Sequence, residues 1–154
     1  MSFIYQIREL QNGGEFVVLL FLAAWGNDTL AYCTGMLIGK HKMSPILSPK
    51  KSIEGLIGGI VGAAILGGLY GMYLNTYIRF SFNPVTMFPV ICGLGGAVSV
   101  IGDLAASAIK RDSGIKDYGT LIPGHGGILD RFDSIIFIAP VIYYLTVMIS
   151  GGAI

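Results

Sequence analysis

Residues 55–74, GLIGGIVGAAILGGLYGMYL, contain no charged side chain and are long enough to cross a bilayer as a helix. A hydrocarbon core of about 30 Å requires about 20 apolar residues. In lipid such a stretch must be helical, because an isolated strand would leave its backbone polar groups without hydrogen bonds. The pairs Gly58–Gly62 and Gly67–Gly71 predict close helix packing, either within the protein or between protomers.

Three further stretches have the same character: 16–39, 85–109 and 134–153. Of the 154 residues, 53% are hydrophobic and only 12% are charged, about half the charged share of a soluble domain. We therefore predict an all-α polytopic membrane protein with about four transmembrane helices, forming one membrane-embedded region over residues 1–154. Cys33 and Cys92 fall in apolar stretches and are expected to be small buried side chains. The net charge of +1 predicts no nucleic-acid partner.

The connections between these stretches differ in charge. Residues 40–54 and 110–133 carry eight Lys or Arg residues, whereas 1–15 and 75–84 carry two. Basic loops stay on the cytoplasmic side of a membrane. The sequence therefore places 40–54 and 110–133 in the cytoplasm.

The segment SAIKRDSGIKDYGTLIPGHGGILDRFD, residues 107–133, concentrates charge beside two apolar stretches. Such a cluster near lipid is costly and indicates a functional site. Asp130 and Asp133 would share one face of a helix, and Asp103 lies near the end of the preceding apolar stretch. Oxygen ligands of this kind suit Mg²⁺. Salt bridges to Arg131, Lys110 or Arg111 are the alternative.

The basic residues of this segment are Lys110, Arg111, Lys116 and Arg131. Arginine binds a phosphate through two parallel hydrogen bonds, and lysine adds a point charge. A non-specific anchor to anionic lipid headgroups is the alternative. His125 lies in a glycine-rich turn, where it is either structural or a proton donor to a phosphate.

Two smaller groups of polar residues accompany this segment. Ser48-Pro49-Lys50-Lys51-Ser52 predicts a turn leading into a helix that Ser52 caps, with Lys50 and Lys51 available to phosphates or headgroups. Asn27 and Asp28 interrupt the first apolar stretch, where they form either buried polar contacts or part of a cavity.

These residues resemble the phosphatidate cytidylyltransferase, or CDP-diacylglycerol synthase, family. The long pattern of that family is matched by Ser107, Lys110, Arg111, Lys116, Asp117, Gly119, Ile122, Pro123, His125, Gly126, Gly127, Asp130, Arg131 and Asp133. WGNDTLAY at 25–32, SPKKSIEG at 48–55 and Gly102-Asp103 match its shorter segments, with Ser52 in place of the usual Thr. Because family members are longer, the chain resembles their C-terminal portion, and the family's N-terminal helices are expected to be missing from it.

The resemblance implies a reaction in which CTP and phosphatidic acid give CDP-diacylglycerol and pyrophosphate. It implies Mg²⁺ held by Asp103, Asp130 and Asp133, with Lys116 and His125 also catalytic. The substrate-binding residues would be Ser107, Lys110, Arg111, Asp117, Arg131, Asn27, Asp28, Ser48, Lys50 and Lys51. The protein would lie in a bacterial inner membrane, in contact with membrane lipid, with its site on the cytoplasmic side. The glycine pairs of residues 55–74 would allow a homodimer.

Two other functions are compatible with parts of the sequence. An inactive membrane scaffold could bind anionic lipid through the basic loops. A small transporter could use Asp28 and Asp103 along its path, although no inverted repeat is visible. The Asp-Gly-x-x-Ala-Arg pattern of the CDP-alcohol phosphotransferases is absent from the sequence.

Overall fold

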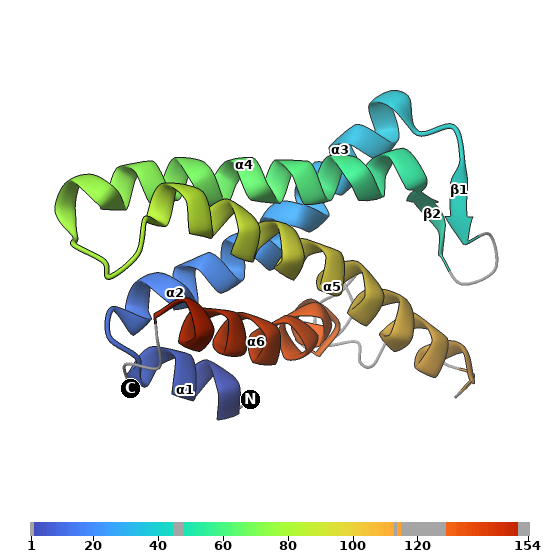
Figure 1. Cartoon of the computed structure of the whole chain (residues 1–154). Coiled ribbons are helices and arrows are strands. Elements are labelled where there is room, and N and C mark those ends of the chain that lie inside the picture. The colour runs from blue at the N-terminus through green and yellow to red at the C-terminus, as the bar shows by residue number, and fades with distance from the viewer. Residues whose placement is uncertain (1, 45–47, 113, 115–128, 151–154) are drawn as a thin grey trace.

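The computed structural model describes residues 2–44, 48–112, 114 and 129–150, with the backbone alone at 44, 48–50 and 129–133. Figure 1 shows the order of the elements along the chain. They are α1 (Ser2–Glu9), α2 (Gly13–Phe21), the π-helical turn η1 (Leu22–Gly26), α3 (Asn27–Ile38), β1 (Lys42–Ser44), β2 (Ser48–Ser52), α4 (Ile53–Tyr77), α5 (Pro84–Asp112) and α6 (Leu129–Ile149).

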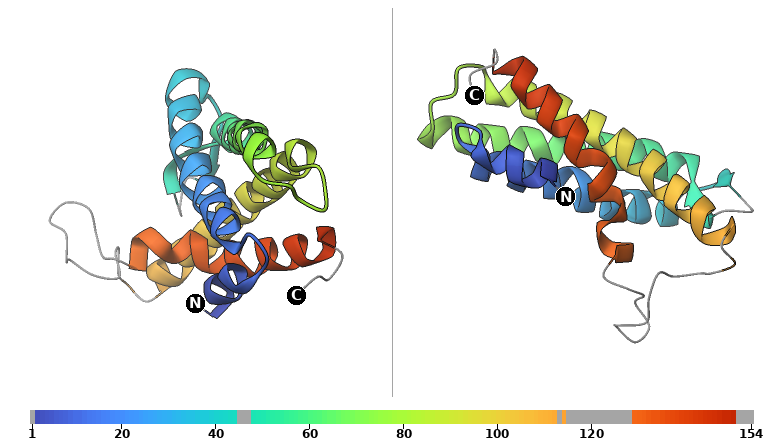
Figure 2. Two further views of the ribbon diagram at one scale, coloured as in Figure 1. Left: turned by 90° about the vertical axis from the view of Figure 1, so that its left-hand side faces the viewer. Right: turned by 90° about the horizontal axis from the view of Figure 1, so that it is seen from below.

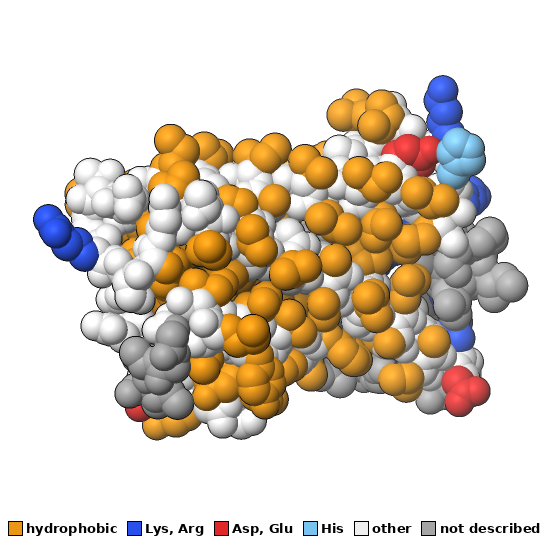
Figure 3. Space-filling model, in the orientation of Figure 1, with side chains coloured by type: hydrophobic (Ala, Val, Ile, Leu, Met, Phe, Trp, Pro, Cys, Tyr) orange, Lys and Arg blue, Asp and Glu red, His pale blue; other side chains and the backbone are white. Residues whose placement is uncertain are grey.

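Three helices in the described residues are long and apolar enough to cross a membrane: Gly13–Ile38, Ile53–Tyr77 and Pro84–Asp112. The first of them runs without a break through α2, η1 and α3. The fourth apolar stretch forms α6, whose apolar part within the described residues is Ser134–Ile149. The predicted all-α polytopic membrane fold is confirmed. In Figure 3 hydrophobic side chains cover the middle of the visible face, and charged side chains lie toward its two ends.

Small residues on α4 allow it to pack closely against α3 and α5. Its buried positions include Gly55, Gly59, Ala63, Gly67 and Gly71, which recur every four residues and so lie on one face. A Cβ added at Gly59 would lie 2.9 Å from the carbonyl oxygen of Asn27 on α3, and one at Gly71 would lie 2.5 Å from that of Pro84 on α5. Backbones this close leave no space for a side chain.

The glycine pairs predicted from sequence are used within the protomer. Gly58 and Gly62 face Thr34 and Leu30 of α3, whereas Gly67 and Gly71 face the first turns of α5. The sequence left open whether these pairs join helices of one chain or of two, and the structure assigns all four to contacts within the chain.

The core lies where α2, η1, α5 and α6 meet. Phe16, Leu20, Phe88, Ile138 and Ile142 are fully or almost fully buried there. Figures 1 and 2 show α4 on one side of this core and α6 with α1 on the other. In lipid, such side chains stabilise the bundle by close packing rather than by removal from water.

Helix α3 leaves the core and packs mainly on α4, so Asn27 is its one buried residue. Cys33 on α3 is exposed, whereas Cys92 on α5 is buried. The expectation that both cysteines are buried is therefore wrong for Cys33, because the helix that carries it has no partner on its outer face among the described elements.

A short antiparallel hairpin joins α3 to α4. Lys42 of β1 pairs with Ser52 of β2, and Ser44 pairs with Ser48. The predicted turn over 48–52 is thus a strand, and this is the one departure from an all-α structure in the described residues. Ser52 does cap α4 as predicted: its hydroxyl accepts a hydrogen bond of 3.0 Å from the backbone N–H of Gly55.

Candidate functional site

A pocket of about 300 Å³ opens at the end of the bundle that carries the hairpin, which we call the hairpin end. Its walls come from α3, the hairpin, the first turn of α4 and the second half of α5. Three charged residues line it: Asp28, Lys51 and Asp103. The remaining lining residues are Ala31, Tyr32, Met43, Ser52, Gly55, Leu56 and Val100. The pocket therefore combines an apolar wall with a few charged groups, as ligand sites in proteins commonly do.

An ion pair crosses the pocket from the hairpin to α5. The Lys51 ammonium donates a hydrogen bond to a carboxylate oxygen of Asp103. The two side chains are 31% and 25% exposed, so both are partly shielded from solvent but can be reached by a ligand. Attraction between such charges is stronger than in open water. The sequence offered Arg131, Lys110 or Arg111 as partners for the carboxylates, and the structure adds Lys51 as a partner of Asp103.

Asp28 reaches the pocket because of the π-helical turn η1. A π-turn adds a residue to one turn of a helix and shifts the direction of the side chains that follow. After this turn Asn27 is fully buried while Asp28, the next residue, is exposed at the pocket. The sequence left open whether these residues make buried polar contacts or line a cavity. In the structure Asn27 is buried and Asp28 lines the pocket.

Asn27 is a polar group inside the apolar bundle. Gly59 of α4 and Gly96 of α5 approach its side chain, and a Cβ at these glycines would lie 2.8 and 3.0 Å from its Oδ1. That oxygen has no hydrogen-bond partner among the described residues. The Asn27 amide nitrogen lies 3.5 Å from a carboxylate oxygen of Asp28, which links the buried residue to the pocket.

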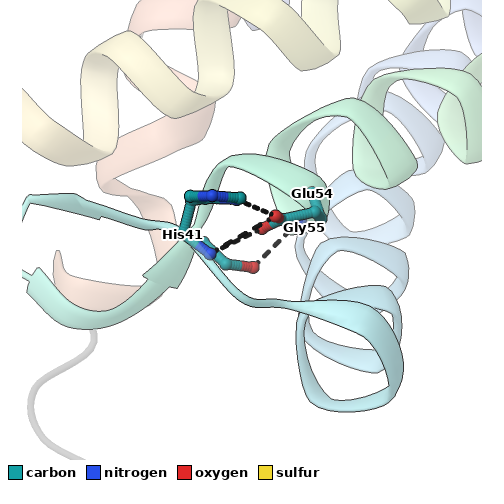
Figure 4. A network of polar contacts seen from close by, with 4 residues as sticks. His41, Glu54 and Gly55 are labelled. Carbon is teal, nitrogen blue, oxygen red and sulfur yellow. Dashed lines mark hydrogen bonds and ion pairs between the residues drawn. The ribbon is translucent and has the colours of Figure 1, made fainter.

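The hairpin is fastened to α4 by His41 and Glu54 (Figure 4). The backbone N–H of His41 donates to the Glu54 carboxylate at 3.2 and 3.3 Å, and the His41 Nδ1 lies 2.6 Å from Glu54 Oε1. In the opposite direction, the Ile53 N–H donates to the His41 carbonyl at 2.9 Å. These contacts hold the base of the hairpin, two residues from Lys51, and so fix the direction in which that lysine approaches α5.

Replacing Glu54 with Ala is expected to loosen the hairpin. The backbone N–H of His41 would lose its carboxylate acceptor, so the amides of β1 and β2 should exchange with deuterium severalfold faster, as measured by mass spectrometry of peptides from 40–54. Glu54→Gln keeps an acceptor oxygen and should show a smaller increase. Equal exchange in wild type and Glu54→Ala would show that strand pairing alone holds the hairpin.

The other predicted site residues fall into three groups. Ser107, Lys110 and Arg111 lie on the last turns of α5, where Arg111 is exposed and the other two are half-buried. Ser48 and Lys50 lie on β2, and Asp130, Arg131 and Asp133 lie at the start of α6, where only the backbone is described. Lys116, Asp117 and His125 lie outside the described residues.

Helix α6 crosses α5 next to Asp103. A Cβ at Gly102 would lie 2.7 Å from the ring of Phe137, so the glycine lets the two helices touch at this point. Asp133 precedes Phe137 by four residues, which is about one turn or 5.4 Å along a helix. The backbone therefore brings the start of α6 toward the part of α5 that carries Asp103.

The described side chains alone form no group of three metal-binding residues. They contribute Asp28 and Asp103, which line one pocket. The predicted set of Asp103, Asp130 and Asp133 includes two side chains that lie outside the description.

Sequence reasoning missed several residues of this site. Met43 and Val100 form apolar walls of the pocket, and His41 with Glu54 fastens its hairpin. Glu54 belongs to the segment 48–55 that matches the family pattern, so the sequence contained a signal that this residue is part of the site. Nothing in the sequence pairs His41 with Glu54, because the pairing depends on the hairpin.

Comparison with known proteins agrees with this arrangement. The model of the cytidylyltransferase family matches residues 1–149. The chain is 36% identical over 149 residues to a phosphatidate cytidylyltransferase of Staphylococcus saprophyticus, a match that covers 97% of this chain and 55% of that protein. It is 41% identical over 149 residues to the Staphylococcus aureus protein of the same name, covering 94% of this chain and 53% of the relative.

A phosphatidate cytidylyltransferase of Thermotoga maritima is 37% identical over 139 residues, which covers 90% of this chain and 52% of the relative. The chain thus spans about half the length of the curated relatives it matches. Because the family model matches residues 1–149, this chain belongs to the cytidylyltransferase family.

Proposed function

We propose that the protein transfers the cytidylyl group of CTP to phosphatidic acid, which gives CDP-diacylglycerol and pyrophosphate. The observation that carries the proposal is the pocket at the hairpin end, where Asp28, Lys51 and Asp103 meet beside apolar helices. A nucleotide can enter such a pocket from water, and a lipid phosphate can enter it from the membrane. Family membership and the names of the relatives support the same reaction.

The chemistry needs no nucleophile from the protein. An oxygen of the phosphatidate phosphate attacks the α-phosphorus of CTP and forms a P–O–P bond. The bond from the α-phosphorus to the bridging oxygen of the β-phosphate breaks, and pyrophosphate leaves with the electron pair. Both reactants are anions, so the task of the protein is to bring them together and to offset their charge.

The basic side chains at the hairpin end suit that task. Lys51 lies in the pocket, and Lys110 and Arg111 lie on the adjacent end of α5. In our proposal they bind the phosphates of CTP and of the lipid, together with Lys50 and Arg131. Lys51 is paired with Asp103 in the structure, so a substrate phosphate would compete with that carboxylate for the ammonium group. The family pattern adds Ser48, Ser107, Lys116, Asp117 and His125 to the proposed site.

We include Mg²⁺ in the proposal because the donor atoms present are of the right kind. Asp103 supplies carboxylate oxygens to a pocket that solvent can reach, and hard cations of this size prefer such oxygens. Asp103 would hold the ion with Asp130 and Asp133. When bound, the ion would offset negative charge on the reacting phosphates.

The proposed location follows from the charge of the hairpin end. Lys40 precedes the hairpin, Lys42 and Lys51 lie in its strands, and Lys110 and Arg111 lie in the last turn of α5. From the positive-inside rule we propose that this end lies in the cytoplasm, where CTP is available, and that the membrane is the bacterial inner membrane. The homodimer stays a prediction. The glycine pairs of α4 make contacts within the chain, so a dimer would have to use another surface.

The test follows two labels of CTP through purified protein in liposomes that contain phosphatidic acid. With ³²P at the α-phosphate, label is expected in a lipid that co-migrates with CDP-diacylglycerol; with ³²P at the γ-phosphate, it is expected in pyrophosphate. Chelation of Mg²⁺ with EDTA should stop both, and added Mg²⁺ should restore them. Transfer of the γ label to lipid would identify a kinase instead, and no transfer of either label would favour a lipid-binding scaffold.

A further inference from the structure

A second pocket, of about 220 Å³, lies at the end of the bundle opposite the hairpin end. We call it the distal pocket. Three segments that are far apart in the sequence build it: the turn between α1 and α2, the connection between α4 and α5, and the last turns of α6. The lining residues are Leu10, Gln11, Asn12, Phe16, Arg79, Phe80, Ser81, Phe82, Thr146 and Ser150.

A buried hydroxyl without a partner lines this pocket. Thr146 is 1% exposed, and its Oγ1 has no hydrogen-bond partner among the described residues. A buried polar group that stays unpaired costs about 1–3 kcal/mol. A ligand in the distal pocket that formed a hydrogen bond with this hydroxyl would remove that cost. The substrates proposed for the hairpin end lie at the opposite end of the bundle and cannot reach Thr146.

Arg79 gives the distal pocket its charge. It is the only basic residue in the connection 78–83, and its side chain is exposed at the pocket rim. The other polar lining residues are neutral: Gln11, Asn12, Ser81, Thr146 and Ser150. Glu15, on the nearby α2, already accepts a hydrogen bond from the Tyr70 hydroxyl. One guanidinium with several neutral polar groups matches a single phosphate, which arginine binds through two parallel hydrogen bonds.

The aromatic lining of the distal pocket and the tyrosines at the same end of the bundle favour a lipid as the source of that phosphate. Its floor is aromatic: the ring of Phe16 lies 6.3 and 6.4 Å from those of Phe80 and Phe82. The exposed rings of Tyr73 and Tyr77 stand on the last turns of α4 at the same end. Exposed tyrosines at the end of a membrane helix mark the headgroup level of the bilayer.

We propose that the distal pocket binds the phosphate group of a membrane phospholipid, with Arg79 and the Thr146 hydroxyl as its donors. The pocket is smaller than the ~300–1,000 Å³ of most small-molecule sites, so it holds the headgroup while the acyl chains lie along the apolar surface of the bundle. This site is separate from the hairpin-end pocket and does not depend on the reaction proposed there.

The test measures which lipids stay bound to the purified chain in native mass spectrometry. Delipidated protein is mixed with phosphatidylglycerol or with diacylglycerol of the same acyl chains. Wild type is expected to retain phosphatidylglycerol in preference to diacylglycerol. Arg79→Gln and Thr146→Val should each retain it about tenfold less, since each loses a hydrogen bond to a charged group.

Thr146→Val also separates a ligand-binding role from a structural one. Valine has nearly the shape of threonine, and the hydroxyl is unpaired without a ligand, so the melting temperature of delipidated protein should stay the same or rise. A fall in that temperature, with unchanged lipid retention, would mean that the hydroxyl serves the fold and would overturn the proposal.

Lys42→Gln is the matched control, because it removes one exposed positive charge at the other end of the molecule. It should leave the difference between the two lipids unchanged. An equal loss of phosphatidylglycerol in Lys42→Gln and Arg79→Gln would indicate non-specific attraction and overturn the proposal, as would equal retention of both lipids by wild type. Inorganic phosphate alone should not raise the melting temperature; a rise that Arg79→Gln abolishes would make free phosphate the ligand and overturn the lipid assignment.

Discussion

Replacing Asp103 with Asn is expected to lower the rate of CDP-diacylglycerol formation by about 10²–10³-fold, the usual loss when one electrostatic contact to a reacting group is removed. The substitution keeps the size of the side chain but removes its negative charge from the pocket that it shares with Lys51 and Asp28. The rate is measured with α-labelled CTP at saturating substrate and Mg²⁺. Size-exclusion chromatography checks that the variant is still folded.

Two further variants show whether the charge of Asp103 acts on the reaction or only on the ion pair. Asp112→Asn removes an exposed carboxylate nine residues further along α5 and should leave the rate unchanged. The exchange Lys51→Asp with Asp103→Lys restores an ion pair with its charges reversed. It should recover thermal stability but not activity. Full activity in Asp103→Asn, or in the exchanged pair, would contradict a role of Asp103 in holding the metal.

Replacing Gly71 with Val is expected to destabilise the bundle by about 1–3 kcal/mol or to prevent its assembly. A Cβ at this position would lie 2.5 Å from the carbonyl oxygen of Pro84, which belongs to the backbone and cannot rotate away. Helices α4 and α5 would have to separate along the face that Gly67 and Gly71 share. The measurement is the melting temperature in detergent, followed in a Cys33→Ser background by the fluorescence of a thiol-reactive dye that reaches buried Cys92 only on unfolding.

Gly93→Ala provides the matched control on α5. A Cβ there would meet only the Cβ of Ala64, at an ordinary contact distance of 3.6 Å. The helix propensity of alanine exceeds that of glycine by about 1 kcal/mol, so this variant should be as stable as wild type or slightly more stable. If Gly71→Val melted at the same temperature as Gly93→Ala, the close contact between α4 and α5 would not contribute to stability.

The sequence predicts the membrane helices well because one physical requirement determines them. Residues 55–74 and 85–109 have no alternative to helix in lipid, and the structure extends them only slightly, to Ile53–Tyr77 and Pro84–Asp112. The cap at Ser52 was also predictable, since it depends on a residue and its next three neighbours. Both the helices and the cap depend on residues that are close together in the sequence, so the sequence alone is enough to predict them.

Contacts between distant residues were not predictable in the same way. Lys51 and Asp103 are 52 residues apart and meet because the hairpin directs β2 toward α5. The hairpin itself was predicted as a turn, since Pro49 and two lysines are poor strand formers. Cys33 was predicted to be buried from its apolar neighbours, but α3 presents it outward. Each outcome depends on how the helices pack, and periodicity alone does not give that information.

The candidate site was predicted partly by type of residue and partly by resemblance to a family. Asp103 was predicted as a site residue because an acid in an apolar stretch needs a partner. Lys51 was predicted as a substrate-binding residue, but not as the partner of Asp103. The roles of Asp130, Asp133, Lys116 and His125 stay predictions, because their side chains lie outside the described residues.

The π-helical turn at Leu22–Gly26 divides one continuous membrane helix into two parts that face different directions. The part before it supplies Phe16, Leu19 and Leu20 to the core, and the part after it supplies Asp28 and Tyr32 to the pocket. Because the extra residue rotates the side chains that follow it, one unbroken membrane segment presents apolar side chains to its neighbours in one half and polar side chains to a ligand in the other.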